Sequence, residues 1–204
     1  MKLYSYVIAR DFGFAPNPFY GFCTLATCKP RIRKGASIGD WIVGTGSTKY
    51  DLHGHLVYAM RVTEDLAFDD YWSDPRFVHK RPNLRGSLKQ WFGDNIYHRN
   101  PRTGRWIQEN SHHSRGTGRP FKSNIDHDTQ TDRVLISDDF VYFGGSAPRI
   151  PAPFRTGNKL WKNGASHKGN FTDAYIERVV EWLRSLGSWG CVGDPAEFAK
   201  IKWA

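Results

Sequence analysis

The 204-residue sequence is poor in cysteine and in long hydrophobic runs. Three cysteines, Cys23, Cys28 and Cys191, are too few for the disulfide framework of a secreted protein, so we expect a reducing compartment and a cytoplasmic location. No stretch approaches the roughly 18 consecutive apolar residues that a transmembrane helix needs, so we expect no membrane partner. The first apolar run, residues 3–9, is short and lacks the features of a signal peptide.

Acidic residues are also scarce, because 20 Asp and Glu face 29 Lys and Arg, which leaves a net charge of +9. Hydrophobic residues make up 39% of the chain, enough to bury a core, so general disorder is excluded. Aromatic residues reach 15%. A basic, aromatic-rich chain is typical of surfaces that bind nucleic acid through phosphates and stacked bases, although an ordinary packed domain has the same balance by chance.

The excess positive charge is confined to residues 76–122, which hold eleven Lys or Arg and two acidic residues. A solvated surface would spread this charge along the chain, so the pattern favours a segment that faces anions. Residues 116–118 contain two glycines, lie between two arginines and are expected to form a flexible loop; contact between this backbone or its arginines and phosphate is the open alternative. The basic residues predicted to bind nucleic acid are Arg81, Arg85, Lys89, Arg115 and Arg119.

The hydrophobic pattern predicts an α+β protein. One helix is expected over residues 172–186, where Thr172 can cap the first turn and Gly187 ends the last. Runs rich in Val, Ile, Tyr and Thr between turn residues predict the strands. These are residues 2–9, 21–27, 40–45, 55–63, 133–137 and 140–143.

Residues 38–77 resemble the PUA-like superfamily, which includes the EVE, YTH and ASCH domains. The resemblance is carried by a Gly39-Asp40 turn before an apolar strand that ends in glycines, and by the later aromatic segment of residues 68–72. It implies a mixed β-barrel with peripheral helices and long basic loops, in which aromatic side chains surround a single nucleobase. Trp41 is equally well explained as a core residue. The candidate base-binding aromatics are Trp41, Tyr50, Tyr71 and Trp72.

A wider set of short motifs resembles the nucleotide modification associated domain 2 family. They include residues 1–6, 9–18, 24–30, 39–46, 93–98, 111–114, 126–129 and 134–137. The resemblance implies a nucleic-acid or nucleotide partner, and proteins of a DNA base modification system as further partners; it supplies no reaction and no catalytic residues. We expect a PUA-like domain over residues 1–150, followed by a linker and a helix over residues 151–204 that pack on the same domain.

One polar cluster contains side chains suited to acid–base chemistry. The candidate catalytic residues are His112, His113, Asp126 and His127. Hydrogen bonding to a ligand or capping of loops explains them equally simply. Metal binding by these side chains together with Asp128, with His98 as a further candidate ligand, or by the Cys23 and Cys28 pair, is the weaker alternative. Both cysteines are expected to be small buried core residues. We therefore expect no metal and no cofactor.

Other chemistries have less support. A serine of this region, Ser111 or Ser114, or Cys23 beside a histidine could act as a nucleophile, but sequence separation does not determine geometry. Neither a phosphate-binding P-loop nor the zinc-binding pattern of a base deaminase is present.

The function that the sequence favours is recognition of a nucleotide or a modified base in nucleic acid, in DNA modification or phage defence. Two alternatives stay open. One is an enzyme that modifies or hydrolyses a nucleotide with the His and Asp cluster. The other is a protein-interaction subunit whose basic segment docks on an acidic partner.

Overall fold

The computed structural model describes residues 1–161, 164 and 166–201. Within them the chain forms two compact units, each assembled from segments far apart in the sequence. The first unit contains Met1–Phe12, Ala36–Thr63 and the described residues from Ser137 onward; the second contains Gly13–Gly35 and Glu64–Ile136. The predicted boundary at residue 150 falls inside the first unit. Both units mix helices and strands, so the predicted α+β class is confirmed.

The first unit is built on a six-stranded sheet in the order β10-β1-β3-β4-β9-β11. The parallel pairs are β1 with β3 and β9 with β11, and the other neighbours are antiparallel. Its strands are β1 (Leu3–Ile8), β3 (Trp41–Gly46), β4 (Leu56–Arg61), β9 (Asp139–Tyr142), β10 (His167–Lys168) and β11 (Gly190–Cys191). Short 3₁₀ turns cover Thr48–Tyr50, Gly144–Ser146, Ala152–Phe154 and Phe198–Lys200.

This sheet is open among the described residues, because β10 and β11 stand at its two ends. The sheets of the second unit have two and three strands and are open in the same sense. The closed PUA-like barrel is therefore not confirmed. The segment that resembles the PUA-like superfamily does contain strands, since the Gly39-Asp40 turn precedes β3 and β3 pairs with β4.

Close packing in the middle of this sheet requires glycine at position 44. A Cβ atom added there would lie 2.3 Å from the ring of Tyr58 and 2.6 Å from the side chain of Ile8. The register between β3 and β4 shifts between Gly44 and Thr45, the signature of a β-bulge. Glycine therefore permits both the irregularity and the approach of the tyrosine ring.

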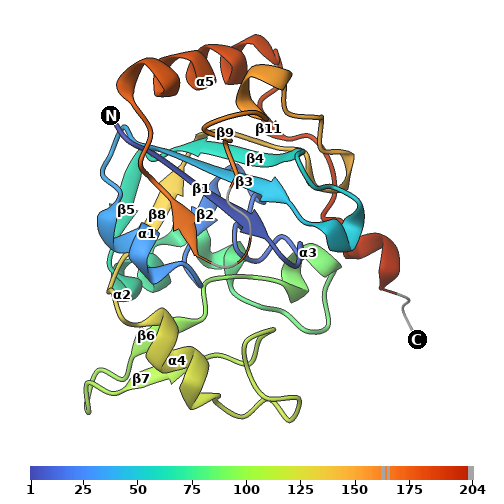
Figure 1. Ribbon diagram of the computed structural model, residues 1–204. Helices are drawn as coiled ribbons and strands as arrows, with labels where there is room; N and C mark the ends of the chain where they lie inside the picture. The colour runs from blue at the N-terminus through green and yellow to red at the C-terminus, as the bar shows by residue number, and fades with distance from the viewer. Residues whose placement is uncertain (162–163, 165, 202–204) are drawn as a thin grey trace. The chain divides into compact units, whose positions relative to one another are not determined.

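Helix α5 (Asp173–Ser185) covers one face of this sheet (Figure 1). Thr172 caps it, because its side chain accepts a hydrogen bond from the Tyr175 amide. The buried side chains, Ile176, Val179 and Leu183, recur at the three- and four-residue spacing of one helical face. The helix predicted from sequence is thus confirmed.

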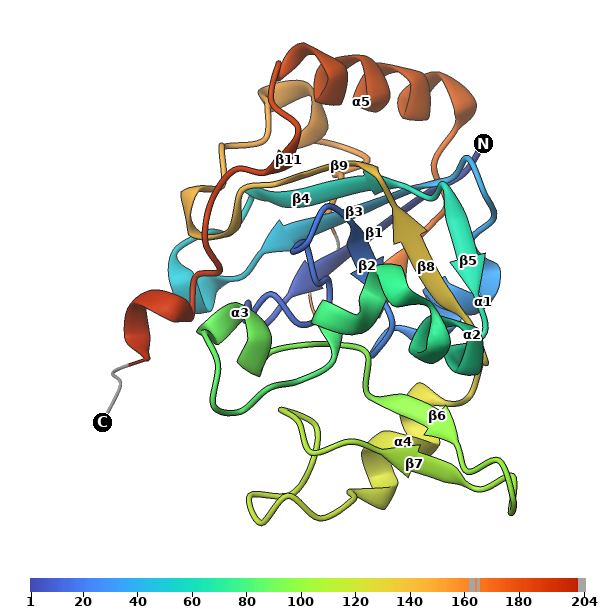
Figure 2. The ribbon, with the colours of Figure 1, turned by 180° about the vertical axis from the view of Figure 1, so that it is seen from behind.

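The second unit contains a three-stranded sheet in the order β2-β8-β5, a two-stranded hairpin and four short helices (Figure 2). Its strands are β2 (Cys23–Leu25), β5 (Glu64–Leu66), β6 (Tyr97–Arg99), β7 (Trp106–Gln108) and β8 (Val134–Ser137). Its helices are α1 (Pro30–Gly35), α2 (Phe68–Ser73), α3 (Leu88–Trp91) and α4 (Lys122–Asp128), with a 3₁₀ turn at Pro75–Lys80. The six strands predicted from sequence correspond to β1, β2, β3, β4, β8 and β9 within about two residues at each end.

The basic segment is not a continuous surface, because Lys80 is fully buried. Its ammonium donates to the backbone oxygen and side-chain oxygen of Asn17, at 3.0 and 2.7 Å, and to the Phe22 carbonyl at 3.0 Å. Asp94, also fully buried, accepts from Thr24 Oγ1 at 2.7 Å and from the Tyr71 hydroxyl at 2.8 Å. Burial raises the pKa of Asp94 and the charge of Lys80 opposes that rise.

No helix of the described residues is long and apolar enough to cross a membrane.

The buried ammonium generates a stability prediction. Lys80→Met should lower the free energy of unfolding by about 3–5 kcal/mol, because it leaves three acceptor oxygens without their cationic donor and removes the charge that opposes the raised pKa of the buried Asp94. The matched control is Lys89→Met, since Lys89 is an exposed lysine of the same basic segment. Urea unfolding of the two variants measures the difference. Equal midpoints for both would contradict the structural role of Lys80.

Candidate functional site

Cys28 lies at a sharp turn between β2 and α1 in the second unit. Its φ is +55° and that of Lys29 is +42°, so two successive residues other than glycine occupy the left-handed region. Such backbone costs about 1–3 kcal/mol per residue and persists where the surroundings hold it, often at functional sites. Here the Cys28 amide donates to Asp128 Oδ1 at 2.7 Å, and Arg33 Nε donates to the Cys28 carbonyl at 2.9 Å. In this turn Cys28 is a partly exposed residue.

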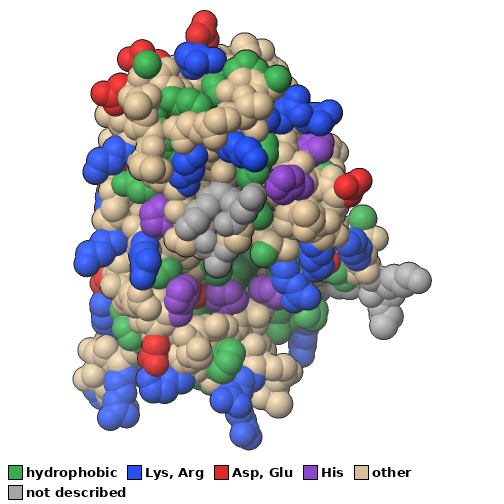
Figure 3. Space-filling model, in the orientation of Figure 1, with side chains coloured by type: hydrophobic (Ala, Val, Ile, Leu, Met, Phe, Trp, Pro, Cys, Tyr) green, Lys and Arg blue, Asp and Glu red, His purple; other side chains and the backbone are tan. Residues whose placement is uncertain are grey.

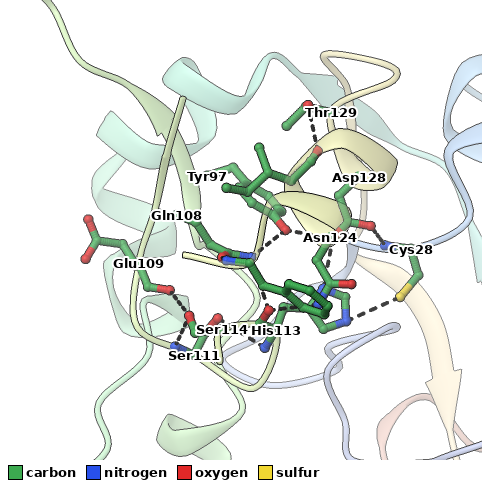
Figure 4. Close-up of polar contacts among 12 residues, drawn as sticks. Cys28, Tyr97, Gln108, Glu109, Ser111, His113, Ser114, Asn124, Asp128 and Thr129 are labelled. Atoms are coloured by element: carbon green, nitrogen blue, oxygen red, sulfur yellow. Dashed lines mark hydrogen bonds and ion pairs between the residues drawn. The ribbon is translucent and has the colours of Figure 1, made fainter. Parts of the chain in front are cut away.

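The thiol faces an imidazole that is itself held by a carboxylate (Figure 4). Cys28 Sγ lies 3.7 Å from His113 Nε2, and His113 Nδ1 lies 2.9 Å from Asp128 Oδ2. Since a carboxylate only accepts, Nδ1 carries the proton of that hydrogen bond and Nε2 is the nitrogen that exchanges a proton with the thiol. His113 thus lies between Cys28 and Asp128, the order in which a nucleophile, a base and an orienting acid are arranged.

Surrounding side chains hold the imidazole and the carboxylate in place. Asp128 is 1% exposed, and its Oδ2 also accepts a hydrogen bond from the Tyr97 hydroxyl at 2.9 Å. The backbone carbonyl of His113 accepts from Asn124 Nδ2 at 2.8 Å and from Gln108 Nε2 at 3.3 Å. The His113 ring packs on Phe14 with 4.6 Å between the ring centres. Both the backbone and the ring of His113 are therefore restrained.

Electrostatics favour a charged imidazole in this position. Burial lowers the pKa of His113, but the hydrogen bonds to Asp128 and Cys28 and their negative charges outweigh it and raise the pKa to about 9. An imidazolium beside a thiol stabilises the thiolate, which is the nucleophilic form of cysteine. The site therefore combines the groups of a reactive cysteine.

Arg33 joins the segments that carry the thiol and the carboxylate. Its fully buried guanidinium donates to the carbonyls of Cys28 and Asp128, and to those of Thr131 at 3.3 Å and Arg133 at 2.7 Å. Burial lowers the pKa of Arg33 to about 10, and the charge of Asp128 opposes that change.

Cys28, His113 and Asp128 are also the kind of side chains that bind a metal ion, and one ligand atom from each lies within 4.8 Å of the others. The orientation of the imidazole argues against a three-ligand centre. Asp128 engages Nδ1, whereas Cys28 faces Nε2. An ion between the sulfur and Nε2 would have two protein ligands, and zinc sites need three or four. The arrangement fits nucleophilic catalysis better than metal binding.

The predicted histidine and aspartate cluster is brought together only in part. His113 enters the site, whereas His112 lies against Phe14 and Phe92 at 5.4 and 5.2 Å between ring centres. Asp126 pairs with Lys122 at 2.6 Å on the exposed face of α4, and His127 is exposed on the same helix. Adjacent residues on a helix point in different directions, so Asp126 and His127 cannot join Asp128 in the site.

The expectation for the cysteines was wrong for one of the two. Cys23 is a fully buried residue of β2, as predicted, but Cys28 is partly exposed at the site. Of the serines considered as nucleophiles, Ser114 accepts from the Ser111 amide at 3.1 Å and donates to the Glu109 carbonyl, which makes it part of a turn. Sequence reasoning missed Cys28 and Asp128 as a pair because 100 residues separate them.

The aromatic residues predicted to bind a base are buried or already in contact with other side chains. Trp41 is 1% exposed and Tyr71 is 0% exposed, so neither ring has a face open to a base. Tyr50 donates from its hydroxyl to Glu197. Trp41 and Tyr50 belong to the first unit, and Tyr71 and Trp72 to the second.

Trp72 has both faces of its ring covered. The His98 ring stacks on it at 4.1 Å between centres, and Arg81 Cζ lies 3.9 Å from its centre. Two groups that close cannot share one face, so they lie on opposite sides. A base would have to displace one of them to stack on Trp72.

The predicted basic residues differ in how far other groups cover them. Arg81 covers Trp72, with its Cζ 3.9 Å from the ring centre. Lys89 Nζ lies 5.4 Å from the centre of the Phe19 ring, and Arg115 Cζ lies 5.3 Å from that of Phe121. Arg85, Arg115 and Arg119 are exposed and form no ion pair with any residue that the structure describes.

The described geometry defines a class, an α+β protein with a cysteine–histidine–aspartate site. Comparison with family models identifies the family: the model for nucleotide modification associated domain 2 matches residues 1–202. The chain belongs to the nucleotide modification associated domain 2 family, which confirms the resemblance noted in its sequence. Comparisons with curated proteins and with solved structures gave no match.

The raised pKa of His113 makes stability depend on pH. The folded value of about 9 lies above the ordinary 6.5, so the contribution is complete below about pH 6.5 and disappears as pH rises through about 9. His113→Gln should lower the free energy of unfolding at pH 6 by up to about 3 kcal/mol more than at pH 10. Urea unfolding across this range measures the change.

The control for this prediction is His127→Gln, because His127 is exposed and lies one residue from Asp128. Its difference from the parent protein should not vary with pH. A His113→Gln profile parallel to that of the parent protein would contradict the charged imidazole.

Proposed function

We propose that this protein is a thiol-dependent enzyme of nucleotide modification that transfers or hydrolyses an acyl group, with Cys28 as the nucleophile. The observation that carries the proposal is the alignment of Cys28 Sγ, His113 Nε2 and Asp128 Oδ2 through contacts of 3.7 and 2.9 Å. A cysteine or serine activated by a histidine, with an acidic group orienting that histidine, is the arrangement that unrelated acyl-transfer enzymes share. Family membership supplies the nucleotide context.

In the first step, the Cys28 thiolate attacks the carbonyl carbon of an amide or ester. A sulfur–carbon bond forms, and the bond between that carbon and the leaving nitrogen or oxygen breaks. His113 donates its Nε2 proton to the leaving group, which departs as a neutral amine or alcohol. Asp128 accepts the hydrogen bond from His113 Nδ1 and so orients the imidazolium for this transfer.

In the second step, water or an acceptor amine attacks the thioester carbon. His113, now neutral, removes a proton from the attacking group through Nε2. The sulfur–carbon bond breaks and the thiolate–imidazolium pair is restored. Neither step requires an oxidant or a reductant, because the carbonyl carbon keeps its oxidation state.

The environment of Cys28 supports this assignment. Cys28 is a partly exposed residue, whereas Asp128 is buried, so a substrate can approach the nucleophile while the orienting carboxylate stays out of water. A cytoplasmic location would suit a free thiol nucleophile, because a reducing compartment keeps it from forming disulfides.

Recognition of a nucleotide or modified base without catalysis is a second candidate function. The exposed Arg85, Arg115 and Arg119, which pair with no acidic residue in the described part of the chain, favour it. A PUA-like ancestry, a role in phage defence and partner proteins of a modification system belong to this candidate. They remain predictions from the sequence.

The reactivity of Cys28 tests the assigned nucleophile. Iodoacetamide should alkylate Cys28 at pH 7 faster than the more exposed Cys191, because His113 Nε2 lies 3.7 Å from the Cys28 sulfur. His113→Ala should slow alkylation of Cys28 about tenfold, because it removes the imidazole that exchanges a proton with the thiol. Peptide mass spectrometry reports the rate at each cysteine separately.

Cys191 is the internal control, and its rate should be the same in both proteins. The assignment of Cys28 as the nucleophile would be overturned if Cys28 reacted no faster than Cys191, or if His113→Ala left the rate at Cys28 unchanged.

Activity distinguishes the two candidate functions. The parent protein and the Cys28→Ser and Cys191→Ser variants would be incubated with nucleotides and oligonucleotides whose bases carry amide or ester substituents. Enzyme activity predicts a product that is lost in Cys28→Ser, kept in Cys191→Ser and insensitive to chelator, as measured by mass spectrometry. Binding without any product across the panel would favour the recognition function.

A further inference from the structure

The loop that connects His113 to α4 brings two arginines opposite one another. The Arg115 amide donates to the Arg119 carbonyl at 3.0 Å, and the Gly118 amide donates to the Arg115 carbonyl at 2.7 Å. These bonds close residues 115–119 into a tight turn with one arginine at each end. The turn begins two residues after the imidazole of the site and leads into the helix that carries Asp128.

Contacts on both sides of this turn hold its shape. On one side, Ser114 Oγ donates to the Glu109 carbonyl at 3.0 Å; on the other, the Phe121 amide donates to Gln108 Oε1 at 2.8 Å. Gly118 has a φ of +77°, and a Cβ atom there would lie 2.6 Å from Asn110 Nδ2. Gln108 also contacts the His113 carbonyl, so the turn and the site share a supporting residue.

The arginines of this turn differ from other arginines of the same unit in having no acidic partner. Arg76, Arg99 and Arg133 each pair with a carboxylate at 2.6–2.8 Å. Arg115 and Arg119 are exposed, and no ion pair joins them to a described residue. Figure 3 shows Lys and Arg side chains projecting from the end of the second unit formed by β6, β7 and α4.

The turn also presents donors from its backbone. The amides of Gly116 and Thr117 donate to no group among the residues described, and both residues are exposed. A Cβ atom at Gly116 would meet nothing within 4 Å, so the space over the backbone is open. Two exposed arginines that flank exposed amides in a glycine-containing turn supply the kinds of donor that phosphate oxygens accept from.

We propose that residues 115–119 form a phosphate-binding turn that holds the phosphate of a nucleotide for the Cys28 site. The proposal rests on the proposed function, because it assigns the substrate as a phosphate-bearing nucleotide rather than a nucleoside or a free base. Arginine contacts phosphate through paired N–H donors, so Arg115 and Arg119 together neutralise its charge and fix its position.

Binding measurements on the full chain test this turn. Isothermal titration would compare the four deoxynucleoside 5′-monophosphates, the matching deoxynucleosides and inorganic phosphate. The parent protein should bind at least one monophosphate about tenfold more tightly than its nucleoside, as expected for charge-assisted hydrogen bonds. Arg115→Gln with Arg119→Gln should abolish that preference. A short single-stranded oligonucleotide in parallel determines whether the phosphate belongs to a free nucleotide or to a strand.

The matched control is Arg102→Gln with Arg105→Gln. It removes the same charge from two exposed arginines in the turn between β6 and β7 of the same unit. This variant should keep the preference for the phosphorylated ligand in full. An equal loss in both double variants would mean that general charge attracts the ligand, and would overturn the proposal, as would an unchanged preference in Arg115→Gln with Arg119→Gln.

Cys28→Ser separates this proposal from the proposed function. It removes the nucleophile, so it should leave the phosphate preference intact even though it abolishes turnover. Loss of the preference in Cys28→Ser would place the phosphate elsewhere and overturn the turn as its site. An unreactive Cys28 together with a preserved preference would remove the proposed reaction and leave the phosphate site standing.

Discussion

The buried carboxylate of Asp128 is the group on which the arrangement of the site depends. Its two oxygens accept from the Cys28 amide, the Tyr97 hydroxyl and His113 Nδ1, so one side chain joins three segments that are remote in the sequence. A buried charge is stable only when it is paired and hydrogen-bonded. The same bonds that satisfy the carboxylate therefore hold the turn of Cys28 and the orientation of the His113 imidazole.

The hydrogen bonds around Asp128 also stabilise the unfavourable backbone turn at Cys28 and Lys29. Two successive residues with left-handed backbone, Cys28 and Lys29, are unfavourable by themselves. Arg33 counteracts this by donating to the carbonyls of both Cys28 and Asp128 from a fully buried position. Favourable hydrogen bonds of the second unit thus offset the cost of the backbone conformation at Cys28. Such an arrangement is characteristic of a preorganised reactive group, which keeps its position before a substrate arrives.

Positive charge has two different uses in the second unit. Lys80 lies in the core, where three acceptors surround its ammonium, and Arg99 pairs with Asp69 and Asp132. These cations stabilise the fold and are not available to a ligand. Arg115 and Arg119 are exposed on a turn next to the site instead. A count of charge along residues 76–122 does not separate these uses, because burial and pairing arise only when distant segments meet.

The sequence by itself determined the elements whose signal is local. Hydrophobic periodicity and a capping threonine determined α5. Runs of β-branched and aromatic residues determined β1, β3, β4 and β9, the four inner strands of the six-stranded sheet. Its short motifs also determined the family. Tertiary structure alone decided that His113 works with Asp128 instead of Asp126 or His127, and that Cys28 faces it instead of Cys23. The physical reason is that neighbouring residues on a helix or strand point in different directions, so which of them enters a site depends on how elements about 100 residues apart pack together.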